Sequence, residues 1–312
     1  MRVFVTGASG WIGSAVVPEL IGAGHHVVGL ARSDASAAAL TAAGAEVQRG
    51  SLDDLDDLRS AAVASDGVIH LAFKHDIAFS GDFPAAAEAD RRAIETFGEA
   101  LGGSDRPLVI ASGLVGLAVG RVVTEQDMPD PDTRSHAAPR IAGAQAALSF
   151  VPRGVRSSVV RLAPSVHGEG DNGFVASLVA VARDKGVSAY IGDGSNRWPA
   201  VHRLDAARLF RLALETAPAG SVLHGVGDEG VKVRDIAEVI GRHLDLPVVA
   251  VSPEDAGGHF GFLAAFLALD APASSALTRE LLGWGPTHPG LIEDLDEGHY
   301  IHSAPALHGA SA

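Results

Sequence analysis

The residues that could do chemistry begin with a glycine-rich turn near the N-terminus. The run Thr6-Gly7-Ala8-Ser9-Gly10-Trp11-Ile12-Gly13 follows a short apolar segment and precedes a helical pattern. In such a turn the first glycine allows a tight bend, the second lets the backbone approach a pyrophosphate, and the third lets the helix pack against the strand. Free N–H groups at the helix start then face the phosphates. The turn predicts a dinucleotide site contacted by Gly7, Ser9, Gly10, Trp11, Ile12 and Gly13.

The end of the second apolar run bears on which dinucleotide is bound. NAD-binding turns of this kind usually carry an acid there, which bonds the ribose 2′-hydroxyl. Here the run ends Gly29-Leu30-Ala31-Arg32-Ser33. Arg32 can pair with a 2′-phosphate and Ser33 can donate to it. We therefore expect NADP(H) to be favoured over NAD(H). Asp34, the first acid after the run, is the alternative, as a contact for an unphosphorylated ribose.

The elements that must position these residues alternate over the first 165 residues. Short β-branched runs bounded by Gly, Asp or Ser predict strands buried on both faces, and longer segments between them have helical spacing. This alternation predicts an α/β fold with a Rossmann-type doubly wound parallel sheet and a smaller C-terminal substrate-binding domain. We expect residues 1–164, with about 200–226, to form the dinucleotide-binding domain, and residues 165–199 and 227–312 the substrate-binding region. Residues 120–139 are expected to form a long exposed loop, and 260–269 an apolar helix.

Several further segments have residue patterns that bear on the fold and on the site. Gly67–Ala72 reads as a fourth strand, and Ala111-Ser112-Gly113 ends a fifth strand. Residues 161–168 read RLAPSVHG, and Val201–Asp205 follows Gly192-Asp193-Gly194. Together with the T-G-x-x-G-x-x-G spacing, these segments resemble the extended short-chain dehydrogenase/reductase family, which includes NAD(P)-dependent epimerases and dehydratases. In its R-P-x-x-x-Y-G segment, this chain has one extra residue and His167 in place of Tyr. The resemblance extends to about residue 245.

The resemblance implies the rest of a nicotinamide-dinucleotide site. Ser51-Leu52 occupies the place of the family's Asp-Leu beside the adenine, and the residues after the fourth strand are expected to line the ribose and nicotinamide. The additional cofactor contacts implied are Ser51, Leu52, Leu71, Ala72, Phe73, Ser112 and Ala163.

The family's usual acid–base pair is missing from this chain. That pair is a Tyr with a Lys four residues later, on one helical face. The sequence has two tyrosines and three lysines, and neither Tyr190 nor Tyr300 is followed by Lys at that spacing. Counting back from the strand at 158–162 puts the tyrosine position at Arg140 and the lysine position at Ala144. Because the pKa of arginine is above about 12, Arg140 is no general acid at neutral pH. The chain is therefore expected to be an atypical member.

Other residues are left to do the chemistry. Ser112 matches the family serine that hydrogen-bonds the substrate carbonyl, and we expect it to polarise the substrate during hydride transfer to or from a small or medium carbonyl or alcohol. His167 and His202 are the catalytic candidates for moving the proton, with Lys74, His136 or water as alternatives. The substrate contacts expected are Lys74, Arg140, His167 and Trp198. Two other hypotheses stay open: an NADP(H)-binding sensor or regulator without turnover, and a nucleotide-sugar epimerase or dehydratase.

Composition excludes several classes of function. With 38 acidic and 24 basic residues among 312 and a formal charge of -14, nucleic acid and anionic membranes are poor partners. The absence of cysteine excludes disulfides and Cys-ligated zinc, and no His-Glu-x-x-His occurs, so no metal is expected. The start of the sequence lacks the pattern of a signal peptide, which favours a cytoplasmic protein. The expected partner is a small-molecule substrate. A homodimer through residues 83–102 and 134–152 is one alternative, a monomer the other.

Overall fold

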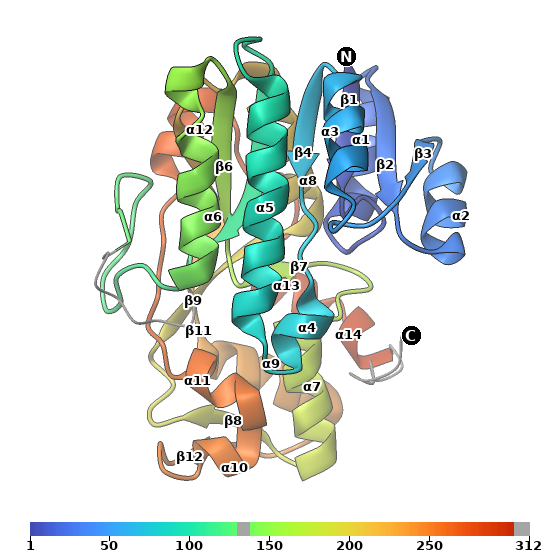
Figure 1. Ribbon diagram of the computed structural model, residues 1–312. Coiled ribbons are helices and arrows are strands. Elements are labelled where there is room, and N and C mark those ends of the chain that lie inside the picture. Colours follow the sequence, from blue (N-terminus) through green and yellow to red (C-terminus); the bar gives the residue numbers. More distant parts are fainter. Residues whose placement is uncertain (130–137, 303–312) are drawn as a thin grey trace.

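The computed structural model of the protein describes residues 1–129 and 138–302, and a seven-stranded parallel sheet lies at its centre (Figure 1). The strand order is β10-β6-β5-β4-β1-β2-β3, and every neighbouring pair is parallel. The strands are β1 (Arg2–Thr6), β2 (His26–Ala31), β3 (Glu46–Arg49), β4 (Gly67–His70), β5 (Pro107–Gly113), β6 (Arg156–Leu162) and β10 (Ser221–Gly225). This order reverses direction between β1 and β4, which confirms the predicted doubly wound sheet. In sheets of this kind ligands bind at the carboxyl ends of the two strands at the reversal.

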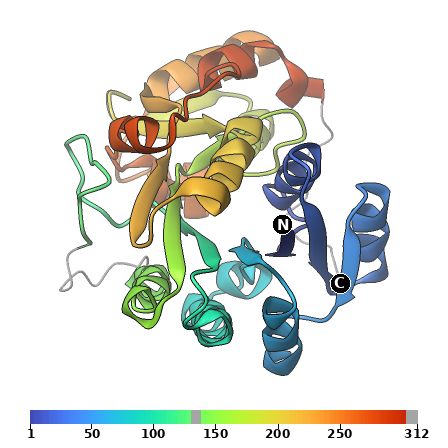
Figure 2. The same cartoon turned by 90° about the horizontal axis from the view of Figure 1, so that it is seen from above.

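Helices cover both faces of this sheet. Figure 2 shows three helices side by side along one face: α3 (Leu55–Val63), α5 (Phe83–Leu101) and α6 (Ala138–Leu148). On the other face, α1 (Gly13–Gly22) packs against α8 (Arg203–Thr216), and α2 (Asp34–Ala42) contacts β2 and β3. Each face has its own apolar cluster.

The longest helix shows how the sequence sets these contacts. In α5 the buried residues recur at helical spacing, from Ala86 through Ala93 and Phe97 to Leu101, and face α3 and α6. Its N-terminus is fixed by Asp82, whose carboxylate accepts a hydrogen bond from the Ala85 N–H at 3.1 Å. The same buried face carries Asp90 toward the sheet, where it becomes part of the site described below.

The C-terminal part has two small sheets and a third apolar cluster. One sheet has the order β11-β9-β7 and the other pairs β12 with β8. Their strands are β7 (Ser165–His167), β8 (Ser188–Ile191), β9 (Arg197–His202), β11 (Asp228–Lys232) and β12 (Val248–Val251). The helices are α7 (Phe174–Lys185), α9 (Val233–Leu244), α10 (Ala256–Phe260), α11 (Ala264–Leu267), α12 (Ala276–Leu282), α13 (Leu291–Asp296) and α14 (His299–His302), and α4 (His75–Phe79) follows β4.

Two local predictions were wrong. Residues 260–269 do not form one helix, because Gly261 has a φ of +58° and separates α10 from the turn that leads into α11. The segment expected to be an exposed loop is partly buried: Val123 bridges to Ala273, and the Glu125 carboxylate accepts from Thr278 N and Oγ1 at 2.7 and 2.6 Å. Residues 130–137 of that segment, His136 among them, lie outside the described residues. Across the described ranges, no helix combines the length and apolarity needed to cross a membrane.

Candidate active site

The glycine turn joins β1 to α1 at the reversal point of the sheet. Gly7 has a φ of +65°, and a Cβ there would lie 2.7 Å from Ala72 N. A Cβ at Gly13 would lie 2.1 Å from Gly7 O, so both glycines are required by the chain itself. At Gly10 a Cβ would meet only Gly7 O, at 3.2 Å. The backbone at Gly10 therefore faces space that the described protein does not fill, as a turn that receives a pyrophosphate requires.

A buried polar chain fixes β1 against β4 beside this turn. Asp90 Oδ1 lies 3.1 Å from His70 Nε2, and His70 Nδ1 lies 2.6 Å from Thr6 Oγ1. Since the carboxylate can only accept, His70 carries its proton on Nε2 and its Nδ1 accepts from the Thr6 hydroxyl. The same hydroxyl oxygen accepts from the Ala72 N–H at 3.3 Å. All three polar side chains are buried, so the chain holds the strand ends that flank Gly7.

The residues predicted to contact the adenosine end lie after β2 and β3. Arg32 is exposed and its nearest anion is Asp76, with the ion-pair atoms 3.4 Å apart. Ser33 is the N-cap of α2, and its Oγ accepts from Ser36 N at 3.2 Å. Asp34, the alternative ribose contact, pairs with Arg49. The tip of β2 therefore presents a cation, Arg32, that makes one ion pair with the described residues, and that pair is exposed to solvent.

Ser51 and Leu52, which follow β3, take different local roles. The Ser51 N–H and hydroxyl both donate to Asp54 Oδ2, at 2.8 and 2.9 Å, which shapes the start of α3. Leu52 is buried in the apolar cluster under α3 and α5. The family's adenine position is thus occupied by a serine already bonded to the chain.

The carboxyl ends of β4 and β5 bring Ser112, Arg140 and Phe73 together. Ser112 is buried, and its hydroxyl makes no hydrogen bond within residues 1–129 and 138–302. Arg140 comes from α6; its Nη2 donates to Ala111 O at 3.0 Å, and its guanidinium carbon lies 4.2 Å from the centre of the Phe73 ring. Removal from water lowers the pKa of Arg140, and the charge of Asp90 opposes that shift.

Two predicted substrate contacts already have partners within the chain. Lys74 Nζ donates to both carboxylate oxygens of Asp53, at 2.7 and 2.6 Å. Trp198 is 2% exposed in the C-terminal apolar cluster, where its Nε1 donates to Phe266 O at 3.2 Å and its ring meets Phe174 edge-on. Trp198 is therefore a core residue, because its position on the middle strand β9 turns the indole toward α7 and α11 rather than to a surface.

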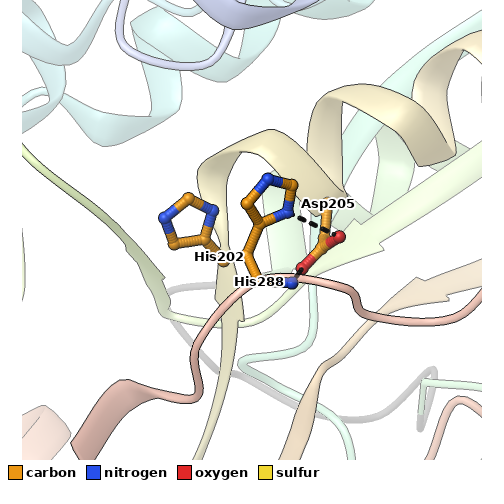
Figure 3. Close-up of side chains that lie close together, drawn as sticks. All are labelled: His202, Asp205 and His288. Carbon is orange, nitrogen blue, oxygen red and sulfur yellow. Dashed lines mark hydrogen bonds and ion pairs between the residues drawn. The ribbon is translucent and has the colours of Figure 1, made fainter. Parts of the chain in front are cut away.

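His167 and His202 are brought together with residues from the C-terminal segment. His167 Nδ1 lies 2.8 Å from Asp294 Oδ2 in the interior, and its Nε2 has no partner among the described residues. The His202 ring meets His167 edge-on, with centroids 5.4 Å apart, and stacks on His288 at 4.7 Å (Figure 3). Burial, followed by the nearby charges of His167 and His288, lowers the pKa of His202 to about 4. His202 is therefore neutral at pH 7.

The same cluster has the ligand types of a metal site but not its geometry. Ligand atoms of His202, Asp205 and His288 lie within 4.8 Å of one another. The planes of the two stacked imidazoles differ by only 11°, however, and imidazole lone pairs lie in the ring plane, so they do not converge on one ion. The Asp205 oxygens already accept from Thr287 N and Oγ1 and from His288 N and Nδ1. These contacts make Asp205 an anchor for the segment 287–288.

Sequence reasoning missed His288, Asp205 and Asp294 as neighbours of the predicted histidines. His288 and Asp294 come from a segment with no recognisable motif, more than 80 residues after His202. Asp205 had a local signal, since an acid in the first turn of a helix commonly interacts with backbone N–H groups. Its bonds instead go to a distant loop.

Trp11 connects the glycine turn to β7 and α8, whereas Ala163 joins the end of β6 to β10. Trp11 Nε1 donates to Val166 O at 2.8 Å, and the Arg203 guanidinium lies 4.2 Å from the Trp11 ring centre. Ala163 is buried and its N–H donates to Gly225 O at 3.2 Å. The turn is thereby in direct contact with β7 and the start of α8.

The fold defines a class of protein: α/β, with a Rossmann-type sheet and a C-terminal lobe packed at its carboxyl edge. A model of the NAD dependent epimerase/dehydratase family matches residues 3–224, and the chain belongs to this family. It is 50% identical to the uncharacterized protein C2A9.02 of Schizosaccharomyces pombe, covering 96% of this chain and all of that one. It is 27% identical to a UDP-glucose 4-epimerase of Streptomyces lividans, covering 96% and 97% of the two chains.

Solved structures show the same fold. The dTDP-glucose 4,6-dehydratase DesIV of Streptomyces venezuelae, with NAD and TYD bound, superposes with a TM-score of 0.76 at 21% identity, over 96% of each chain. MoeE5 in complex with UDP-glucose and NAD has a TM-score of 0.73 at 24% identity, over 95% of this chain and 96% of that one. At these identities the likeness concerns the fold.

Proposed function

We propose that the protein binds NADP(H) and catalyses hydride transfer to or from a small or medium carbonyl or alcohol. The observation that carries this proposal is the open backbone at Gly10 on the same sheet edge as Ser112, a residue whose hydroxyl has no hydrogen-bond partner in the described chain. When bound, a nicotinamide dinucleotide supplies or accepts the hydride, so that a carbonyl gains hydride on carbon and a proton on oxygen.

The residues of this chain would have separate roles. The turn shaped by Gly7 and Gly13 would receive the pyrophosphate at Gly10. Arg32 would turn from its exposed pair with Asp76 to a 2′-phosphate, because such surface pairs contribute at most about 1 kcal/mol. The Ser112 hydroxyl would donate to the substrate oxygen and favour charge on it.

We propose water as the source of the proton. Lys74 is bound to Asp53, and His167 is enclosed with Asp294. His202, with a pKa of about 4, is neutral at pH 7 and a weak acid there. Its Nδ1 accepts from Leu204 N at 3.2 Å, which leaves a proton on Nε2. His167 and His202 stay predictions as the alternative path.

A second candidate is epimerisation or dehydration of a nucleotide-linked sugar. It is motivated by the similarity to the UDP-glucose 4-epimerase over nearly the whole of both chains. The missing Tyr-x-x-x-Lys pair and the arginine at the tip of β2 count against it. A sensor that binds NADP(H) without turnover is the third candidate. We keep the cytoplasm, a small-molecule substrate and a homodimer through α5 and α6 as expectations.

Titration of the purified protein with NADPH and NADH, followed by fluorescence, tests the binding step. A panel of aldehydes, ketones, UDP-glucose and dTDP-glucose, followed at the absorbance of the reduced nicotinamide and by product analysis, tests the reaction. We expect tighter binding of NADPH and its oxidation by simple carbonyl compounds. Conversion of the sugar nucleotides alone would favour the second candidate, and binding without any turnover the third. Failure to bind either dinucleotide would overturn the proposal.

A further inference from the structure

Arg140 is partly removed from water, yet the described protein leaves most of its N–H donors unused. A guanidinium has five N–H donors. Within the described residues, that of Arg140 makes one hydrogen bond, to Ala111 O, and no ion pair. Its flat face lies over the Phe73 ring, which holds it in place without satisfying its N–H groups.

Two other arginines show how the fold satisfies a guanidinium that has a structural role. Arg106 donates to four backbone carbonyl oxygens at the ends of α3 and α5. Arg156 donates to Leu214 O and Ala217 O at the end of α8. Each of them closes a helix C-terminus. Arg140 closes none, since its one acceptor is the last-but-two residue of strand β5.

No acid of the described chain neutralises Arg140 by direct contact. Asp90 is the acid whose charge acts on it, but Asp90 Oδ1 accepts from His70 and no hydrogen bond joins Asp90 to Arg140. A cation that is partly removed from water is costly unless an anion pairs with it. Within the described residues the guanidinium thus lacks a paired anion, and the carboxylate of a ligand would supply one.

The position of Arg140 indicates where on a substrate the negatively charged group would lie. Its acceptor, Ala111, is adjacent in the chain to Ser112, and consecutive Cα atoms are about 3.8 Å apart. An anion on Arg140 and an oxygen on Ser112 would thus both lie at the carboxyl end of β5. A carbonyl with a carboxylate on the next carbon offers both groups in one small molecule, and a planar fork of N–H donors matches a carboxylate.

We propose that Arg140 binds a substrate carboxylate, and that the preferred substrates are 2-oxo acids or the corresponding 2-hydroxy acids. This inference rests on the proposed function, because it assigns the carbonyl oxygen to Ser112. Arg140 is a specificity-determining residue in it, and its fixed charge replaces the phenol that the family usually has on this helix.

A matched pair of substrates tests the selectivity. Phenylglyoxylate and its methyl ester have the same carbonyl and ring, but only the first is an anion. We expect wild-type protein to have the higher kcat/KM for the acid. Arg140→Gln should lose about 10- to 150-fold on the acid, the range for hydrogen bonds to charged groups, and less than about threefold on the ester. Arg140→Lys should lose less on the acid, since it keeps the charge.

Binding of oxamate, an unreactive 2-oxo acid analogue, gives a readout without turnover. Calorimetry on the protein alone and with NADPH should show at least about tenfold weaker binding in Arg140→Gln. Arg153→Gln is the matched control, because Arg153 also lies over an aromatic ring, that of Phe150, remote from the site. Its affinity for oxamate should equal that of wild type.

The outcomes separate this inference from the proposed function. Equal oxamate affinity in wild type and both Arg140 variants overturns the inference. So does a wild-type protein that reduces the ester as well as the acid, although the proposed function then stands. Arg140-dependent oxamate binding in a protein that binds neither dinucleotide supports the carboxylate site and overturns the proposed function.

Discussion

At the scale of single residues, removal of the Ser112 hydroxyl oxygen should slow the reaction without weakening dinucleotide binding. This hydroxyl has no partner in the described protein, so Ser112→Ala leaves no buried group unsatisfied. We expect dinucleotide affinity within about twofold of wild type and a kcat/KM about 100-fold lower, as for loss of one donor to a developing oxyanion. Titration and steady-state kinetics measure both. Ser60→Ala, on the exposed side of α3, is the control, and equal activity in Ser112→Ala would remove Ser112 from the mechanism.

At the same scale, we expect Arg32 to decide the choice between the two dinucleotides. Because it can reach a 2′-phosphate but gains nothing from a 2′-hydroxyl, Arg32→Ala should weaken NADPH binding about 10- to 100-fold and leave NADH binding within about threefold. Fluorescence titration with both dinucleotides measures this. Arg59→Ala removes an exposed arginine of α3 and should change neither constant. An equal loss for NADH and NADPH would mean that Arg32 acts on a part common to both, and would favour Asp34 as the ribose contact.

At the scale of elements, the glycines of the turn differ in role. Gly7 and Gly13 are needed for the fold, whereas Gly10 is expected to contact the ligand. Gly10→Ala adds a Cβ that meets only Gly7 O, at 3.2 Å, so we expect the protein to fold with a loss below about 1 kcal/mol. The methyl group would occupy the space that a pyrophosphate needs, and dinucleotide binding should fall at least about 100-fold. Gly22→Ala, in α1 with no neighbour within 4 Å, is the control for stability and binding. Unchanged dinucleotide affinity in Gly10→Ala would contradict the site.

The elements also show where prediction from sequence succeeds and fails. The strands and helices of the first 165 residues could be predicted because their patterns are local in the sequence. The glycine turn at Gly7 and the periodic apolar residues of α5 are examples. The C-terminal lobe depends on strand pairs that are distant in sequence, such as β7 with β9. Gly261 interrupts an apolar run that its residue pattern alone predicts to be one continuous helix. In the site, Ser112 and Arg140 were predicted from the resemblance to the family, whereas His288 and Asp294 have no sequence pattern that relates them to His202.

At the scale of the whole molecule, the C-terminal segment is tied into the dinucleotide-binding part. Trp284 and Ala273 belong to the same apolar cluster as α1 and α8. Trp284 Nε1 donates to Asp205 O at 3.0 Å, and the Asp205 carboxylate holds Thr287 and His288. The histidine cluster thus lies where chain segments from before and after α8 meet.

This position makes His202 a determinant of acid stability. Its pKa is about 4 in the folded protein and about 6.5 in an unfolded chain, and it faces His167, His288, Asp294 and Asp205. Between these values the unfolded state binds more protons, so His202 contributes full stability above about pH 6.5 and loses it as the pH falls toward 4. We therefore expect the free energy of unfolding of His202→Gln, from urea titrations at pH 7.0 and 5.0, to fall less than that of wild type. His26→Gln, which changes an exposed imidazole, should keep the wild-type difference. Equal pH differences in wild type and His202→Gln would show that other groups cause the acid sensitivity.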